Sequence, residues 1–202
     1  MGSKPVEKTA NSRALPRSPE LMNRNDSALL VIDAQEKLLS VVPNCDRIVW
    51  NIRRLLDAAK ELGVAIGGTE QYPERLSPTV PEIKERLGAA PDKLCFSAGV
   101  CGEIFERWKD DSRYRVLLCG IETHVCILQT ALDLAAAGFE TYVAVDAVGT
   151  RHAIDHEIAL RRMESAGVVL TTTETAMFEW CRTAEGPEFK RISALAKEQG
   201  PI

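Results

Sequence analysis

The chain has 202 residues, of which 45% are hydrophobic and 27% are charged, and its net charge at pH 7 is -4. This composition fits one folded domain with a sizeable core, and a mildly acidic chain without a basic cluster gives no reason to expect nucleic acid or an anionic membrane as a partner. The longest apolar runs, LLVID and VLLCGI, have the length of strands and fall far short of the roughly 20 residues that span a bilayer.

The first 25 residues, MGSKPVEKTANSRALPRSPELMNRN, are polar and interrupted by prolines. They contain no hydrophobic run of the kind that a secretory signal has, so we expect a cytoplasmic protein. Six cysteines without a CxxC pair or a regular spacing agree with a reducing compartment. We therefore predict a polar tail over residues 1–25 and a single domain over residues 26–202.

Apolar runs with the length of strands alternate along the domain with segments of helical periodicity. Residues 70–91, which contain four prolines, are predicted as a long, stiff loop. In chain order, we predict a strand over Ala28–Asp33, a helix over Asp46–Leu62, strands over Val64–Thr69 and Asp92–Phe96, a helix over Gly102–Lys109, a strand over Arg115–Gly120, a helix over Val125–Ala137, a strand over Glu140–Val148, a helix over His152–Ala166, a strand over Val168–Thr171, and helices over Thr173–Trp180 and Glu188–Lys197.

A glycine separates a helix from an apolar strand in each of the runs LGVAIGGT, AGFETYVAVD and AGVVLTT. Strands that are buried on both faces, with helices between them, indicate the α/β class. We therefore predict a three-layer α/β/α, Rossmann-like fold around a mostly parallel central sheet. In such sheets a ligand binds beyond the carboxyl ends of the strands.

Three residues with possible chemistry lie at predicted strand ends or in the turns beyond them. Asp33 closes the first strand, Lys93 lies in the short strand after the 70–91 loop, and Cys126 begins the helix after the strand that ends at Gly120. Each one also has a plainer explanation. Asp33 can cap the next turn, Lys93 can be a solvated surface lysine, and Cys126 can fill a small apolar space at a helix start.

Three segments together resemble the isochorismatase-like cysteine hydrolase family, which includes nicotinamidases, N-carbamoylsarcosine amidohydrolases and ureide-type amidases. They are ALLVIDAQ, DKLCFSA and GIETHVCILQTALDLAAAGFETYVAVDAVGTR, and the resemblance extends over about residues 26–180. Its most specific part is the G-x-x-T-x-x-C motif from Gly120 to Cys126. The segment TEQYPERLSPTVPEIKERLG resembles the subgroup often named isochorismatase-domain proteins.

The resemblance implies a catalytic triad of Asp33, Lys93 and Cys126. It also implies an oxyanion hole formed by the backbone N–H groups of Glu122 and Cys126, and a cis peptide bond between Ile121 and Glu122. In this scheme the Lys93 ammonium and the helix N-terminus stabilise the Cys126 thiolate, and Asp33 accepts the thiol proton. Members of the family are usually oligomers, so we expect a homo-oligomer.

Polar side chains in loops beyond the strand ends are the candidates for substrate contacts: Gln35, Gln71, Tyr72 and Thr123. Their alternative role is to stabilise turns. We expect the substrate to be a small molecule.

The chain departs from the nicotinamidase branch at the metal site. That branch has an Asp-x-His motif and further histidines after the second strand, whereas this chain reads GTEQYP there, without a histidine. His152 and His156 have the four-residue spacing of a helical metal site, but no third ligand is near them in sequence. We therefore expect neither a metal nor a cofactor.

Together these features predict a metal-independent cysteine hydrolase that cleaves a C–N bond of a small amide or ureide through a thioester intermediate. Two other functions stay open. The chain can be a catalytically idle family member that acts as a binding or scaffold protein, or a thiol redox sensor that needs only a reactive Cys126.

Overall fold

The computed structural model describes residues 15–201. The strands in this range are β1 (Ser27–Ile32), β2 (Ala65–Gln71), β3 (Asp92–Lys93), β4 (Arg115–Ile121), β5 (Glu140–Gly149) and β6 (Val169–Thr171). The helices are α1 (Glu36–Leu39), α2 (Cys45–Leu62), α3 (Pro73–Leu76), α4 (Pro81–Leu87), α5 (Gly102–Asp110), α6 (Leu128–Ala136), α7 (Ala153–Ser165), α8 (Thr173–Cys181) and α9 (Phe189–Ala196), with short turns of helix at η1 (Ala98–Val100) and η2 (Thr123–Ile127). None of the helices described is long and apolar enough to cross a membrane.

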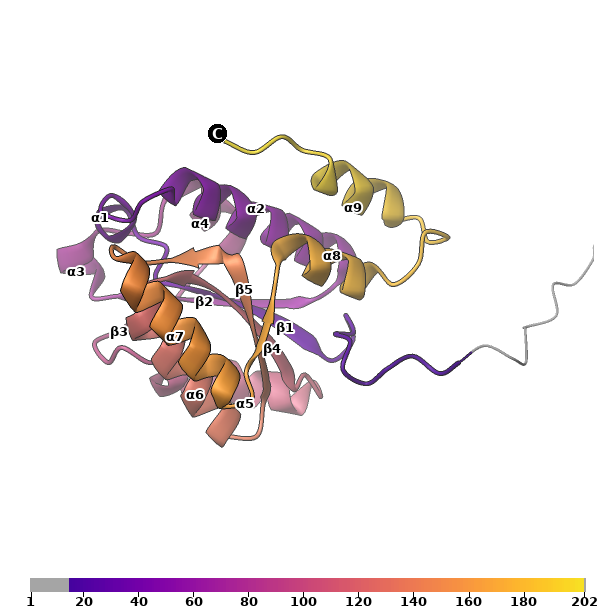
Figure 1. The fold of residues 1–202 in the computed structure, drawn as a ribbon, viewed down its shortest axis with the longest axis horizontal. Coiled ribbons are helices and arrows are strands. Elements are labelled where there is room, and N and C mark those ends of the chain that lie inside the picture. The colour runs from indigo at the N-terminus through magenta and orange to yellow at the C-terminus, as the bar shows by residue number, and fades with distance from the viewer. Residues whose placement is uncertain (1–14, 202) are drawn as a thin grey trace, which may run out of the picture.

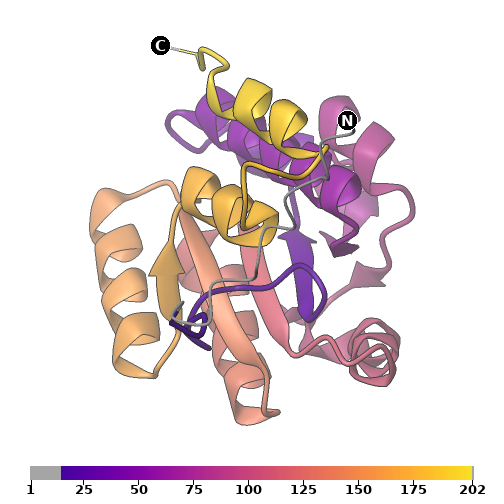
Figure 2. The same ribbon diagram turned by 90° about the vertical axis from the view of Figure 1, so that its right-hand side faces the viewer.

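The strands, which are labelled in Figure 1, form one sheet. Their order is β3-β2-β1-β4-β5-β6, and each neighbouring pair is parallel. Helices cover both faces of this sheet (Figure 2). The predicted three-layer α/β/α fold is therefore confirmed, and in the part of the chain that the structure describes the sheet is parallel throughout. Alternation along β1 shows why both faces are apolar. Leu29 and Val31 belong to the apolar core that contains residues of α2, α4, α8 and α9, while Leu30 and Ile32 belong to the one that contains residues of α5, α6 and α7.

The strand order changes direction at β1. From β1 the chain first builds outward through β2 and β3, and then returns to add β4, β5 and β6 on the other side of β1. The carboxyl ends of β1 and β4 therefore lie side by side at a topological switch point, where the connections that follow them diverge. In open parallel sheets this is the place where a crevice for a ligand forms.

Two predictions between residues 70 and 96 were wrong. The segment 70–91 contains α3 and α4, each of which begins with a proline at its first helical position, and Ile83 of α4 is buried against α2. The strand predicted over Asp92–Phe96 ends at Lys93. After Lys93 the chain leaves the strand pairing, and the carbonyl groups of Cys95 and Phe96 accept hydrogen bonds from the Lys93 ammonium.

The end of the predicted N-terminal tail is packed against the domain. Met22 is completely buried, and its backbone N–H donates a hydrogen bond of 2.9 Å to the Glu179 carboxylate of α8. The Arg17 guanidinium donates to the carbonyl groups of Met22 and Glu179. This part of the predicted tail therefore belongs to the folded domain, while residues 1–14 lie outside the described residues.

Candidate active site

Asp33 lies immediately after β1, with a backbone φ of 52° and a completely buried side chain. One carboxylate oxygen accepts a hydrogen bond of 2.8 Å from the Thr69 hydroxyl, and the other accepts one of 2.7 Å from Lys93 Nζ. Its backbone N–H donates to the Thr69 carbonyl at 3.1 Å. Positive φ is uncommon outside glycine but is better tolerated by aspartate than by most residues. Thr69 thus fixes both the backbone and the carboxylate of Asp33.

Lys93 reaches the same place from β3, at the carboxyl edge of the sheet. Its side chain is completely buried, and Nζ is surrounded by Asp33 Oδ2 at 2.7 Å, Gln71 Oε1 at 2.6 Å and the Phe96 carbonyl oxygen at 2.9 Å. A buried ammonium needs a carboxylate partner and further hydrogen bonds to offset its desolvation, and this lysine has both.

Cys126 approaches from the other side of β1. Near its end, β4 passes very close to β1 at Gly120, where a Cβ would lie 1.9 Å from the Ile32 carbonyl oxygen. The φ of Gly120 is 120°, which glycine adopts readily. The Ile121–Glu122 peptide bond is cis, as the family resemblance implies, and η2 begins directly after it. Cys126 Sγ lies 3.8 Å from Lys93 Nζ, and the residue is 5% exposed. Asp33, Lys93 and Cys126, which are far apart in the sequence, therefore meet in one buried cluster.

Electrostatics in this cluster favour a neutral thiol before substrate binds. Burial raises the pKa of the Cys126 thiol, and the nearby Asp33 carboxylate raises it further, while Lys93 acts in the opposite direction. Burial also raises the pKa of Asp33, against the lowering effect of Lys93. Burial thus opposes the stabilisation of the thiolate by Lys93, so the thiol proton needs a base, which is the role that the family resemblance implies for Asp33.

The Glu122 backbone N–H stays a predicted oxyanion donor. The Glu122 backbone lowers the pKa of the Cys126 thiol, against the larger raising effect of burial. The Glu122 side chain is engaged elsewhere, because its carboxylate accepts hydrogen bonds of 3.0 Å from the Thr150 hydroxyl and from Arg151 Nε. The Cys126 backbone N–H stays the predicted second donor.

The four residues predicted to contact substrate have different surroundings. Gln35 and Thr123 are completely buried and hydrogen-bonded within the protein, Gln35 to the Gln71 backbone and Thr123 to His156 Nδ1. Gln71 is also buried, and its amide binds Lys93 Nζ and the Leu94 carbonyl oxygen. Tyr72, at 39% exposure, is the member of this group that faces solvent. Gln35, Gln71 and Thr123 thus have polar partners within the protein, and their contacts with substrate stay predictions.

The sequence did not point to Thr130, which connects the segment that holds Cys126 to the segment that follows Lys93. Its hydroxyl donates to the Cys126 carbonyl at 2.6 Å and accepts from the Ala98 N–H at 2.9 Å, so η2 and the segment after Lys93 are joined. The signal was weak, because a threonine four residues after a helical carbonyl is common.

Replacing Thr130 by valine keeps the shape but leaves the Ala98 N–H without its acceptor. Since Ala98 is completely buried, we expect the variant to lose about 1–3 kcal/mol of unfolding free energy in a urea titration. Thr141→Val is the matched control, because that buried hydroxyl makes one long hydrogen bond of 3.5 Å. An equal loss in the two variants would contradict the assigned role.

His156 makes the stability of the fold depend on pH. Burial lowers its pKa below 6.5, so between the two values the unfolded chain binds more protons than the folded one. The unfolding free energy therefore falls as the pH drops from above 6.5 through the depressed folded pKa. We expect His156→Gln to lose less unfolding free energy than the wild type between pH 7.5 and about 5.5, as measured by urea unfolding. Identical losses in both proteins would refute this.

Within residues 15–201 there is no group of three or more His, Cys, Asp or Glu side chains that could hold a metal ion. His156, one half of the candidate pair, instead binds the Thr123 hydroxyl.

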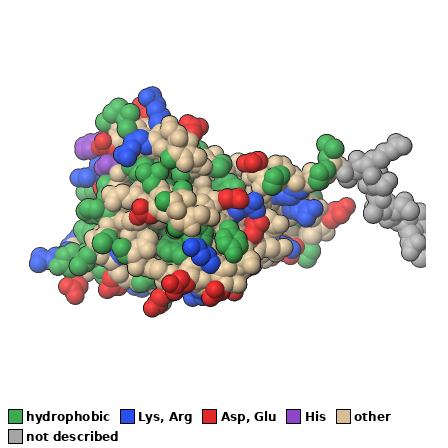
Figure 3. Space-filling model, turned by 90° about the horizontal axis from the view of Figure 1, so that it is seen from below, with side chains coloured by type: hydrophobic (Ala, Val, Ile, Leu, Met, Phe, Trp, Pro, Cys, Tyr) green, Lys and Arg blue, Asp and Glu red, His purple; other side chains and the backbone are tan. Residues whose placement is uncertain are grey.

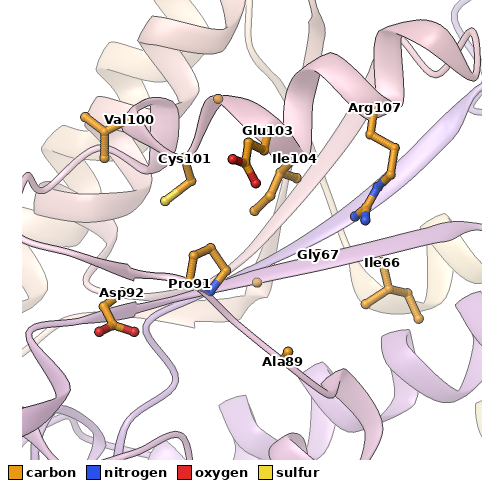
Figure 4. A pocket seen from close by; sticks show the side chains of 12 residues that line it. Ile66, Gly67, Ala89, Pro91, Asp92, Val100, Cys101, Glu103, Ile104 and Arg107 are labelled. Atoms are coloured by element: carbon orange, nitrogen blue, oxygen red, sulfur yellow. The ribbon is translucent and has the colours of Figure 1, made fainter.

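A surface cavity of about 480 Å³ lies near the cluster but is separate from it (Figure 4). It is lined by Gly67 of β2 and Asp92 of β3, by Cys101 directly before α5, and by Glu103 and Arg107 of α5. Asp33, Lys93 and Cys126 do not line it. On the face shown in Figure 3, acidic and basic side chains are interspersed with apolar ones, so this face carries charge of both signs.

The protein is thus a parallel three-layer α/β protein with a buried Cys–Lys–Asp cluster at the switch point of its sheet. The chain belongs to the isochorismatase domain family, whose model matches residues 27–175. It is 41% identical over 177 residues to mouse isochorismatase domain-containing protein 2A, with 87% of this chain and 84% of the relative covered.

Solved structures show the same fold. The structure of MAR1 ribonuclease from Caenorhabditis elegans has a TM-score of 0.83 and 38% identity, over 90% of this chain and 95% of that one. The YcaC gene product of Escherichia coli, described as an octameric hydrolase of unknown specificity, has a TM-score of 0.81 and 26% identity, over 89% of this chain and 92% of that one. The family and these neighbours support a hydrolase.

Proposed function

We propose that this protein is a cysteine hydrolase that cleaves a C–N bond of a small amide or ureide through Asp33, Lys93 and Cys126, without a metal or cofactor. The observation that carries the proposal is the convergence of these side chains, with Lys93 Nζ at 2.7 Å from Asp33 and 3.8 Å from the Cys126 sulfur. Acyl transfer requires a nucleophile with a base and a stabilising cation beside it, and here Asp33 and Lys93 lie beside the Cys126 sulfur.

In the proposed reaction, Asp33 takes the proton of the Cys126 thiol as the sulfur attacks the substrate carbonyl carbon. The backbone N–H groups of Glu122 and Cys126 stabilise the oxyanion that develops. When the C–N bond breaks, Asp33 returns the proton to the departing nitrogen and leaves a thioester on Cys126. Water then attacks the thioester, Asp33 accepts its proton, and the carboxylic or carbamic acid leaves as the proton returns to the sulfur.

The charge of the site supports a neutral amide over a nucleic acid. The ribonuclease activity in the name of the C. elegans relative concerns a phosphodiester anion. Here the Lys93 charge is already paired with Asp33, and the chain carries a net charge of -4. A neutral carbonyl compound meets no electrostatic barrier in such a site.

The experiment is a screen for ammonia or amine release from a panel of small amides and ureides, with a short RNA in a parallel assay. We expect turnover of at least one panel member by the wild type and none by Cys126→Ala. Cleavage of the RNA alone would overturn the proposal. Rapid, reversible oxidation of Cys126 by peroxide with no turnover would favour the redox sensor, and inertness in every assay would favour the scaffold.

We also propose a homo-oligomer in the cytoplasm. The octameric E. coli relative supports the assembly, and so do Leu94 and Phe96, which are 72% and 53% exposed. The cysteines of the described residues are all unpaired, which agrees with a reducing compartment. Light scattering at defined concentrations tests the assembly, and a monomeric mass would contradict it.

A further inference from the structure

The place of Lys93 in the site is set by the neighbouring strand. Gln71 and Lys93 occupy the same register position in the parallel pair β2–β3, so their side chains leave the same face of the sheet. The Gln71 amide oxygen accepts a hydrogen bond of 2.6 Å from Lys93 Nζ. Because β3 has only two residues, its own ladder does little to hold the lysine.

The acceptors around Lys93 account for all of its donors. An ammonium has three N–H groups, and Asp33 Oδ2, Gln71 Oε1 and the Phe96 carbonyl lie within 2.9 Å, with the Cys95 carbonyl further away at 3.3 Å. The Cys126 sulfur, at 3.8 Å, is therefore influenced mainly by the charge of Lys93. The effect of that charge depends on where Nζ is held.

Gln71 is itself fixed. Its amide nitrogen donates to the Leu94 carbonyl at 2.8 Å, which leaves the amide oxygen facing Lys93. The Gln35 side chain binds the Gln71 backbone on both sides, accepting from its N–H at 2.7 Å and donating to its carbonyl at 3.0 Å. The hydrogen bonds of Gln35 and the Leu94 carbonyl thus hold both the backbone and the side chain of Gln71 in place.

We propose that Gln71 is a positioning residue that holds the Lys93 ammonium beside Cys126, with Gln35 holding Gln71 in turn. This inference rests on the proposed function, because it assigns a task to Lys93 in that reaction. A neutral amide suits the task. It supplies an acceptor for the ammonium without cancelling its charge, whereas a second carboxylate would leave the buried cluster net negative and oppose the formation of a thiolate.

The test compares Gln71→Glu and Gln71→Met with the wild type by two measurements. The first is the pH dependence of Cys126 alkylation by iodoacetamide, followed on the Cys126 peptide by mass spectrometry so that the other cysteines do not interfere. The second is kcat and KM for an amide from the screen. Gln129→Glu is the matched control, because it adds the same charge at an exposed site on α6.

We expect Gln71→Glu to slow Cys126 alkylation by about tenfold or more at each pH below the midpoint, the equivalent of an upward pKa shift of about one unit. Both Gln71 variants should lower kcat by about tenfold or more while KM stays within about threefold, and Gln129→Glu should change neither quantity. An unchanged alkylation profile in Gln71→Glu, or a loss confined to KM, would overturn the inference, since either result fits a substrate contact. If Gln71→Met does not fold, Gln71→Glu decides.

The two proposals fail in different ways. If the wild type hydrolyses no amide, the proposed function is wrong, and the alkylation profile of Gln71→Glu still decides whether Gln71 positions Lys93. If the wild type hydrolyses an amide and the Gln71→Glu profile matches it, the proposed function stands and the positioning role is wrong.

Discussion

Cys126→Ala is expected to lower kcat/KM for the hydrolysed amide by about 10⁴-fold or more, because the acceptor of the acyl group is removed. The remaining groups can still bind substrate and polarise its carbonyl, but no thioester can form. The measurement is the rate of ammonia or amine release under conditions in which the wild type is far from saturation. The alanine also removes a single buried sulfur, so the fold should persist and can be checked by thermal unfolding.

Cys45→Ala is the control for this variant. Cys45 is a free cysteine at the start of α2, outside the cluster, and burial and the neighbouring Asp46 raise the pKa of its thiol. Its loss should leave turnover unchanged. If Cys126→Ala retained more than about one hundredth of the wild-type rate, covalent catalysis by this residue would be refuted.

We expect Asp33→Asn to slow substrate turnover but to speed the alkylation of the Cys126 thiol. Turnover should fall by about 10³-fold or more, because the group that accepts the thiol proton and returns it to the leaving nitrogen is lost. Alkylation of Cys126 near neutral pH should become faster, since the carboxylate that raises the thiol pKa is gone while Lys93, which lowers it, remains. Both changes are measured on the same preparation.

Asp110→Asn, at the exposed end of α5, is the control for loss of a negative charge and should alter neither rate. Alkylation that is slower in Asp33→Asn than in the wild type would contradict the assigned electrostatics. Turnover that survives in this variant would contradict the role of Asp33 as the base.

The fold was predictable because its signals are local. The alternation of apolar strands such as Ala28–Asp33 with periodic helices such as Asp46–Leu62 is present in the sequence, and parallel sheets bring strand ends together. The convergence of Asp33, Lys93 and Cys126 follows from these rules together with the family resemblance. Neither α3 nor α4 was predicted, because the prolines that begin them also suit a loop.

The finer parts of the site depend on strand register and burial, which a single sequence does not contain. Gln71 faces Lys93 only because β2 and β3 pair in one register, and Thr69 binds Asp33 only because β2 lies beside β1. Lys93 and the helix start were expected to stabilise the Cys126 thiolate. Burial acts against this by raising the thiol pKa, and the extent of burial depends on how the layers pack.

The most direct test of the central claim, that Cys126 forms a thioester with a small amide or ureide, is rapid acid quench of the wild type with such a substrate, followed by peptide mass spectrometry. We predict that the Cys126 peptide gains the mass of the acyl or carbamoyl group within the first turnover, with an equal amount of ammonia or amine released, and that Cys126→Ala shows neither. Steady hydrolysis with an unmodified Cys126 peptide at every quench time, and with the same rate in Cys126→Ala, would contradict the account.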